Sequence, residues 1–444
     1  MILPKRSRTR LPYPLASQLR YLAVGVVYSV LGALVAPRFR RKVRLDELTT
    51  ARILILKPCC LGDVVFATAL VRELRHALPN AHVTFGVGKH SRPAIATHPA
   101  IDALLDTDPV GSGAYTPRDY LALVNQIRSQ RFDACLVLER SALLALLPLF
   151  AGVPTRIGID SGGRGFSLTV GVSAQPARPE SALYLDLLRA IGGRPRSGEI
   201  EYVPSPEATR RVDALVRERL PSERRFAVLH CAGGTNPGMT LLRKRWPMAS
   251  FHALARRIAR AGVAVVLVGS ADDRAVVADW ESGIGDRGSG VRGARSEGNS
   301  AAGQGSGDVK FVGDLAGECR ELAASPNTQY PSPIPFVDLI GQLSLDELAA
   351  LARRAVVYVG NDSGPTHLAE AAGANVVMLF GPSDPIVYGP RNQRAVAVTA
   401  GLWCSPCFEN GRIAPCANVI CMQALSVERV WRDVSRFVNV EEGR

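Results

Sequence analysis

The chain has 444 residues, 47% of them hydrophobic, and a formal net charge of +13. This length is sufficient for two or three domains with sizeable cores. Residues 1–50 hold ten Lys and Arg against two acidic residues, a net charge of +8 that leaves only +5 for the rest. Such a basic tail favours a membrane surface as partner, and no zinc-finger spacing or aromatic-interleaved basic patch supports binding of nucleic acid.

Residues 21–36 form an uncharged run of 16 residues inside this tail, and a basic cluster follows from Arg38. A membrane-spanning helix needs about 20 apolar residues, with a lower limit near 17, so the run is of borderline length. A signal peptide would have a cleavage site where Pro37 and the basic cluster stand. We therefore expect residues 1–50 to be a membrane-associating tail that lies in or re-enters the membrane surface. A transmembrane span and a helix packed on the protein remain alternatives.

From residue 52 onward, short apolar runs alternate with segments of helical periodicity. The expected strands of this first half are residues 53–56, 83–87, 103–105, 134–138 and 156–159. Alternation of this kind predicts a doubly wound parallel sheet, whose ligand sites lie at the carboxyl ends of its strands. We assign residues 51–205 to an N-terminal Rossmann-like domain.

The α/β pattern restarts after two helical stretches, with expected strands at residues 226–229 and 263–268. Residues 206–444 are therefore a second Rossmann-like domain, and the two domains are expected to face a cleft. Residues 283–308 contain nine glycines in 26 positions and almost no large apolar side chains. Such a segment cannot bury enough surface to fold, so we expect a disordered insertion near 283–335.

The most informative stretch begins with a β-branched run, residues 355–359, that ends in the turn 360–364. Ser363 can cap the helix that follows, and Gly373 can end it. The turn and the helix N-terminus direct several backbone N–H groups to one point, which is an anion site. His367 can add a donor to the same anion. An ordinary strand-to-helix turn with a capping Ser is the alternative.

Residues 359–385, VGNDSGPTHLAEAAGANVVMLFGPSDP, closely resemble the donor-binding motif of glycosyltransferase family 9, the ADP-heptose:lipopolysaccharide heptosyltransferases. The resemblance spans roughly residues 52–435 and implies a GT-B architecture with two Rossmann-like domains. It also implies a nucleotide-sugar donor at this motif. The donor-binding residues expected here are Asn361, Asp362, Ser363, Gly364 and His367.

Asp63 follows the first strand, at the start of a helix, where an Asp can simply be an N-cap. The string Leu61-Gly62-Asp63-Val64-Val65 resembles the family's Gly-Asp motif, whose Asp is the proposed general base. Inverting glycosyl transfer needs such a carboxylate to accept the proton of the acceptor hydroxyl. Cys59 and Cys60 depart from the small polar residues expected here, and we give them no nucleophilic role.

A Gly-rich loop after the strand at 226–229 leads to Lys244-x-Trp246. This element resembles the family's Lys-x-Trp, whose Lys contacts donor phosphate and would stabilise the leaving ADP. A solvated basic face is the alternative for Lys244. Thr235, in a loop longer than usual, is a further donor-binding candidate. At the end of the next strand an acidic side chain, for which Asp272 is the candidate, could bind ribose hydroxyls.

Cys404, Cys407, Cys416 and Cys421 allow a structural zinc site, disulfides or free thiols. Free thiols are favoured, since the cytosol keeps cysteines reduced. Residues 206–444, the domain expected to bind the nucleotide sugar, contain no Asp-x-Asp motif for a metal–nucleotide complex, so we expect no cofactor and no required metal.

The resemblance implies an inverting transferase that moves heptose from ADP-heptose to the lipopolysaccharide inner core. Its partners would be the nucleotide-sugar donor, a lipid-linked glycan acceptor and the cytoplasmic surface of the inner membrane. One alternative is a family 9 relative that uses another nucleotide sugar for a different surface glycan. A non-catalytic nucleotide-sugar binding protein is another. A Rossmann dehydrogenase is disfavoured, because no Gly-x-Gly-x-x-Gly follows the first strand.

Overall fold

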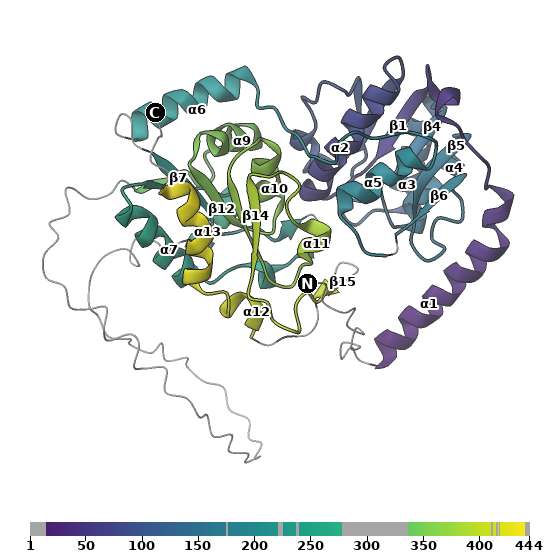
Figure 1. The fold of residues 1–444 in the computed structure, drawn as a ribbon. Helices are drawn as coiled ribbons and strands as arrows, with labels where there is room; N and C mark the ends of the chain where they lie inside the picture. The colour runs from purple at the N-terminus through teal and green to yellow at the C-terminus, as the bar shows by residue number, and fades with distance from the viewer. Residues whose placement is uncertain are drawn as a thin grey trace, which may run out of the picture.

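The fold consists of two α/β domains joined side by side, with one long helix projecting from the first (Figure 1). The computed structural model describes residues 15–174, 176–220, 225–236, 239–277, 336–409, 412–413, 416 and 418–439. The insertion expected to be disordered, near residues 283–335, lies outside the described residues.

A sheet of six parallel strands, in the order β3-β2-β1-β4-β5-β6, forms the N-terminal domain. Its strands are β1 (Arg52–Leu56), β2 (His82–Val87), β3 (Ala103–Asp106), β4 (Ala134–Val137), β5 (Thr155–Asp160) and β6 (Val170–Ser173). Its helices are α2 (Leu61–Ala77), α3 (Pro117–Ser129), α4 (Ala142–Phe150) and α5 (Glu180–Arg189), with a short 3-10 turn, η3, at Arg92–Ala94.

Alternation of side chains along β1 builds the two cores of this domain. Ile53 and Ile55 pack with α2 and α5 on one face of the sheet, whereas Leu54 and Leu56 pack with α3 and α4 on the other. All four side chains are fully buried. A central parallel strand is covered on both faces, which explains its continuous apolar sequence.

The C-terminal domain repeats this topology with the strand order β11-β10-β7-β12-β13-β14. Its strands are β7 (Phe226–His230), β10 (Ala264–Leu267), β11 (Phe336–Asp338), β12 (Val357–Asn361), β13 (Val376–Phe380) and β14 (Ala395–Thr399). Two short hairpins join β8 (Thr235–Asn236) to β9 (Met239–Thr240) and β15 (Phe408–Glu409) to β16 (Arg412–Ile413).

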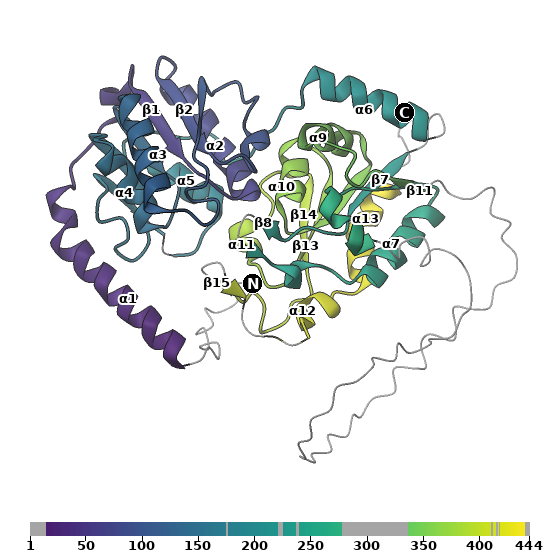
Figure 2. The ribbon, with the colours of Figure 1, turned by 180° about the vertical axis from the view of Figure 1, so that it is seen from behind.

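Helices cover both faces of the second sheet as well (Figures 1 and 2). Helices α7 (Met248–Arg260) and α13 (Val427–Val438) pack on one face, and α6 (Pro206–Arg219), α9 (Leu345–Arg354) and α10 (Gly364–Ala371) on the other. The remaining short elements are η4 (Leu242–Lys244), η5 (Ala271–Val277), α11 (Pro385–Tyr388) and α12 (Ile420–Gln423). Gly373 follows α10 with φ +85°, the left-handed conformation expected of a helix stop.

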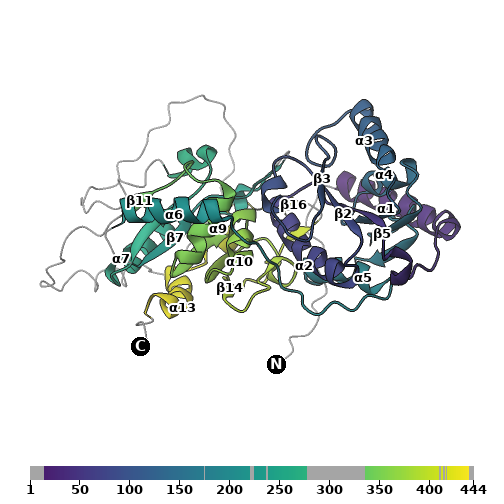
Figure 3. The same ribbon diagram turned by 90° about the horizontal axis from the view of Figure 1, so that it is seen from above.

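The two domains touch where α2 meets α10 (Figure 3). The hydrophobic core of the first domain continues into the second, because it includes the buried Leu368, Ala371 and Ala372. The backbone N–H of Tyr202, in the passage between the domains, donates to Ala371 O at 2.8 Å. The two sheets that carry the candidate active site described below therefore share one hydrophobic core.

Helix α1 (Leu15–Leu34) projects from the first domain but touches it at Gly163 and Arg164, and the chain that follows α1 packs on the domain. Ala36, Val43 and Leu48 are buried, around the 3-10 turns η1 (Ala36–Arg38) and η2 (Leu45–Leu48), and Arg40 forms an ion pair with Asp160 at 2.7 Å. The segment expected to be a membrane-associating tail thus has two parts: helix α1, and the chain around η1 and η2, which packs on the N-terminal domain. In the described part of the chain, no helix has both the length and the apolar character to cross a bilayer.

Candidate active site

Asp63 lies in the first turn of α2, just beyond the carboxyl end of β1. Cys60 takes the N-cap position, so Asp63 does not cap this helix. Its carboxylate instead contacts Lys57, with Nζ and Oδ2 3.0 Å apart. The same Nζ lies 2.6 Å from Oε1 of Glu139, beyond the end of β4. A carboxylate in the first turn also suits the positive end of the helix dipole.

The Lys57 side chain is almost fully buried, whereas the Asp63 side chain is 28% exposed. Burial alone would lower the pKa of Lys57, but the carboxylates of Asp63 and Glu139 raise it well above its usual value. Burial raises the pKa of Glu139, although the Lys57 charge opposes it. Lys57 is thus a permanent cation that holds Asp63 in place and leaves its carboxylate open on one side.

Asp362, after β12, is the centre of the second half of the site. Its Oδ2 lies 2.7 Å from Lys244 Nζ, and its Oδ1 lies 3.0 Å from His367 Nε2. The carboxylate is buried. Burial would raise the pKa of Asp362, but the charges and hydrogen bonds of Lys244 and His367 hold it well below its usual range. The pair with Asp362 likewise raises the pKa of His367 against the effect of burial.

Lys244 lies between this carboxylate and two aromatic rings. Its Nζ is 4.9 Å from the ring centre of Phe408 and 5.8 Å from that of Tyr388. The Lys244 side chain is 14% exposed. The element Lys-x-Trp therefore presents a fixed, partly desolvated cation next to the N-terminus of α10, which favours a bound anion.

Asn361 and Ser363 are tied to backbone and neighbouring side chains. The Asn361 amide donates to Cys231 O at 3.1 Å and to Ala232 O at 2.9 Å, and its Oδ1 accepts from Trp246 N at 2.9 Å. It thereby joins the loop after β7 to the Lys-x-Trp element. Ser363 occupies the N-cap position of α10 but makes no capping hydrogen bond. Its Oγ lies 3.1 Å from Thr366 Oγ1.

Thr235 and Asp272 are exposed, away from these buried contacts. The neighbouring Asp273 is the buried carboxylate of the loop after β10, where it accepts from Ser270 N at 2.9 Å and Ser270 Oγ at 2.8 Å. Arg245 lies 3.8 Å from Asp273 and donates to Gly233 O. Asp273 therefore stabilises the conformation of this loop through its hydrogen bonds, whereas the Asp272 side chain is exposed to solvent at the loop surface.

The two halves of the site meet through two glycines. A Cβ on Gly62 would lie 3.1 Å from His367 Cδ2, and a Cβ on Gly364 would lie 2.7 Å from Leu61. The ring centres of Phe66 and His367 are 4.7 Å apart. The absence of side chains at both glycines thus lets the first turns of α2 and α10 approach, which brings the Asp63 turn next to the Asp362 turn.

Of the four C-terminal cysteines, Cys404, Cys416 and Cys421 are free thiols. Burial raises the pKa of Cys421 to about 11, with further contributions from the other three thiols. Over the described ranges, no group of three or more His, Cys, Asp or Glu side chains is arranged to hold a metal ion.

The sequence predicted no role for Lys57, Glu139 and Tyr388, which the structure places in this site. Lys57 gave one usable signal, since a lysine directly after a buried parallel strand lies where ligand sites form. Glu139 gave a similar signal after β4. Neither position reveals that the two side chains meet, because 82 residues separate them.

Comparison with known proteins places this geometry in a family. The model of glycosyltransferase family 9 (heptosyltransferase) matches residues 120–284 and 307–418, more than half of the chain. Lipopolysaccharide heptosyltransferase 2 of Escherichia coli K12 is 26% identical over 354 residues, which cover 78% of this chain and 86% of the relative.

Two solved structures share the fold. A family 9 glycosyltransferase from Veillonella parvula has a TM-score of 0.67 at 18% identity, covering 90% of this chain and 99% of that one. The E. coli ADP-heptose lipopolysaccharide heptosyltransferase II has a TM-score of 0.61 at 20% identity, covering 88% and 100%. The predicted GT-B architecture and the predicted family are both confirmed. The chain belongs to glycosyltransferase family 9, the heptosyltransferases.

Proposed function

We propose that this glycosyltransferase transfers heptose from ADP-heptose to the lipopolysaccharide inner core with inversion at the anomeric carbon. The observation that carries the proposal is the meeting of two helix N-termini from opposite domains. One bears the carboxylate of Asp63, and the other bears Asp362 paired with Lys244 and His367. A base and an anion-binding group beside one another are what transfer from a nucleotide sugar requires.

Asp63 acts as the general base in this mechanism. Its carboxylate accepts the proton of the acceptor hydroxyl while the hydroxyl oxygen attacks the anomeric carbon of the sugar. Attack occurs on the face opposite the departing ADP, so the configuration inverts. Lys57, held from its other side by Glu139, orients the carboxylate through the 3.0 Å ion pair.

Lys244 and the N-terminal turn of α10 hold the donor diphosphate. The ammonium group and the backbone N–H groups of that turn stabilise the negative charge that develops on ADP as the bond breaks. The His367 imidazole is buried and hydrogen-bonded to Asp362, so it positions this carboxylate instead of contacting phosphate. Asp362 in turn places Lys244 and faces the donor sugar region.

A nucleotide-sugar panel tests the substrate. The purified chain is incubated with ADP-heptose, other ADP-sugars, UDP-sugars and GDP-sugars, and binding is measured by calorimetry. Transfer is then measured with truncated lipopolysaccharide as acceptor, by mass spectrometry of the product. We expect binding and transfer with ADP-heptose. Turnover of a different nucleotide sugar would favour the second family 9 function, and binding without turnover would favour a non-catalytic protein.

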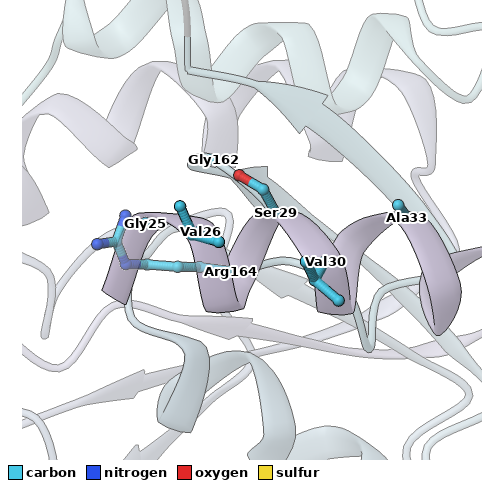
Figure 4. A pocket seen from close by; sticks show the side chains of 7 residues that line it. All are labelled: Gly25, Val26, Ser29, Val30, Ala33, Gly162 and Arg164. Carbon is cyan, nitrogen blue, oxygen red and sulfur yellow. The ribbon is translucent and has the colours of Figure 1, made fainter. Parts of the chain in front are cut away.

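We also propose that the enzyme works at the cytoplasmic face of the inner membrane, with α1 as its contact. The support lies in apolar side chains that α1 leaves exposed, namely Val24, Val26, Val27, Val30 and Leu34. Figure 4 shows Val26 and Val30 on an open groove that α1 forms with Gly162 and Arg164. Exposed Arg38, which donates to Leu34 O at the end of α1, adds positive charge to this helix, and apolar insertion combined with anionic-lipid attraction makes a stable anchor.

Vesicle flotation tests the membrane contact. The full chain should float with vesicles rich in anionic phosphatidylglycerol, and a chain lacking residues 1–35 should not. The cut is placed before the buried Ala36, because residues beyond it pack on the domain. Replacing Val26 and Val27 by Asp should also release the protein, whereas Leu121→Asp, at an equally exposed position on α3, should not. Flotation of the shortened chain would contradict this role of α1.

A further inference from the structure

Two adjacent thiols, Cys59 and Cys60, lie in the loop between β1 and α2, and no step of the proposed reaction uses them. Both are free cysteines, and their Sγ atoms are 2.6 Å apart. Cys59 is 7% exposed, whereas Cys60 is more accessible. Because the two cysteines are adjacent in the sequence, their thiols stay close together even when the surrounding structure moves.

The surroundings of this pair favour thiol chemistry. The hydrogen bond between the two Sγ atoms lowers the pKa of Cys59, and the charge of nearby Lys57 acts in the same direction against burial. A thiolate, not a thiol, is the nucleophile in thiol–disulfide exchange. The pair is also linked to the helix that carries Asp63, because Cys60 O accepts from Val64 N at 2.9 Å.

We propose that Cys59 and Cys60 form a vicinal dithiol that is a modification site of this enzyme. Small-molecule disulfides oxidise it to a vicinal disulfide. Phenylarsine oxide, a trivalent arsenical, bridges it without a change of oxidation state: the two sulfurs replace the oxygen on arsenic, and that oxygen leaves as water with the two thiol protons. Either modification suppresses glycosyl transfer at Asp63.

The oxidation proceeds in two thiol–disulfide exchange steps. Cys59, the thiol with the lowered pKa, loses its proton to solvent, attacks one sulfur of the small disulfide and releases one thiolate. Cys60 then loses its proton, attacks Sγ of Cys59 in the mixed disulfide and releases the second thiolate. One S–S bond is broken and one is formed, and the two released thiolates take up the two protons. The small disulfide is reduced and the protein dithiol is oxidised, with no electrons left over.

Modification of this loop displaces the general base, Asp63, and leaves the donor site unchanged. Cys60 occupies the N-cap of α2, and Asp63 follows in its first turn, so a bridge between the two sulfurs moves the start of this helix. Adjacent Cα atoms are at most about 3.8 Å apart, which is closer than disulfides usually span, so thiols reverse the bridge. The donor site lies on the other domain. The loss of turnover rests on the proposed role of Asp63, whereas formation of the bridge does not.

The experiment uses the full chain, equilibrated with mixtures of glutathione and glutathione disulfide, quenched with acid to stop exchange, and then alkylated in denaturant near neutral pH. Peptide mapping reads the state of the Cys59–Cys60 peptide, and turnover and ADP affinity are measured on the same samples. We expect the peptide to lose two hydrogens. Turnover should fall about ten- to a hundredfold, the scale of a small misplacement of a catalytic group, with ADP affinity unchanged and full recovery in dithiothreitol.

Variants separate this site from the other thiols. Cys59→Ser and Cys60→Ser should keep their turnover in the oxidising buffer, and phenylarsine oxide should inhibit the wild type but neither variant. A Cys404→Ser/Cys407→Ser variant should respond as the wild type does. Complete alkylation of both thiols after oxidation would overturn the site, and a bridged peptide with unchanged turnover would overturn its effect. If no transfer is found with any donor, the peptide map still decides whether the bridge forms.

Discussion

Asp63→Asn is the most direct test of the catalytic assignment. The substitution removes the negative charge that accepts the proton but keeps an oxygen to which Lys57 can donate. Loss of a general base costs about 10²- to 10⁴-fold in rate, or about 2.7–5.4 kcal/mol of transition-state free energy. Binding of the ADP-sugar should change by less than a few-fold, because the donor contacts lie on the other domain.

The stability cost of this substitution should be small. Removing the only partner of a buried charge costs about 3–5 kcal/mol, but Lys57 retains Glu139 at 2.6 Å. The Asp63 side chain is 28% exposed, so its share of the ion pair is worth about 1 kcal/mol or less. A thermal melt should therefore shift by only a few degrees, about 2–4 °C.

The assay compares transfer rates, donor affinity and melting of the wild type and the variant. Asp106→Asn is the matched control, since Asp106 also ends a strand of the same sheet but lies outside the site. It should leave turnover unchanged. A folded Asp63→Asn enzyme with near wild-type turnover would remove Asp63 from the mechanism. A large loss of donor affinity would show that Asp63 also holds the donor.

Three further predictions address the other half of the site. Lys244→Ala should weaken ADP binding about 10- to 150-fold, the value of a charge-assisted hydrogen bond of roughly 1.5–3 kcal/mol; calorimetry checks it against Arg243→Ala, and unchanged affinity would refute the phosphate role. The raised pKa of His367 stabilises the fold fully below the unfolded pKa near 6.5 and less as pH rises through the folded pKa. His367→Gln should therefore flatten the decrease in unfolding free energy above about pH 6.5, measured by urea titration; a variant with the wild-type slope would show that the pair does not contribute. Gly364→Ala places a Cβ 2.7 Å from Leu61, so it should separate α2 from α10 and reduce turnover, with an overpacking cost in folding free energy of about 1–3 kcal/mol. Gly113→Ala is its control, because a Cβ there meets nothing within 4 Å. Equal turnover of the two variants would contradict the packing argument.

Much of the fold follows from local pattern alone. The central strands are continuous apolar runs bounded by turns, so the expected strands at 53–56, 226–229 and 263–268 agree with β1, β7 and β10. The edge strands β6 and β14 were missed. Their side chains are mostly half-buried or exposed, and such strands lack the uninterrupted apolar run by which a buried strand is recognised.

Family motifs directed attention to Asp63, Lys244 and Asp362, and local strand-to-helix patterns place each of them beside the end of a strand or at the start of a helix. Their partners could not be inferred in the same way. Lys57 meets Glu139 across 82 residues, and Lys244 meets Asp362 across 118. Parallel strands adjacent in the sheet are distant in the chain, so only the strand order brings these side chains together.

Local sequence determined the elements, the two domains and the residues able to do the chemistry. Tertiary structure decided which of those residues face one another. It buried Asp273 and exposed Asp272, although both follow the same strand, because only one of them can turn back to the N–H of Ser270. It also folded the basic segment after α1 onto the first sheet, since the ion pair of Arg40 with Asp160 and the burial of Val43 depend on residues far along the chain.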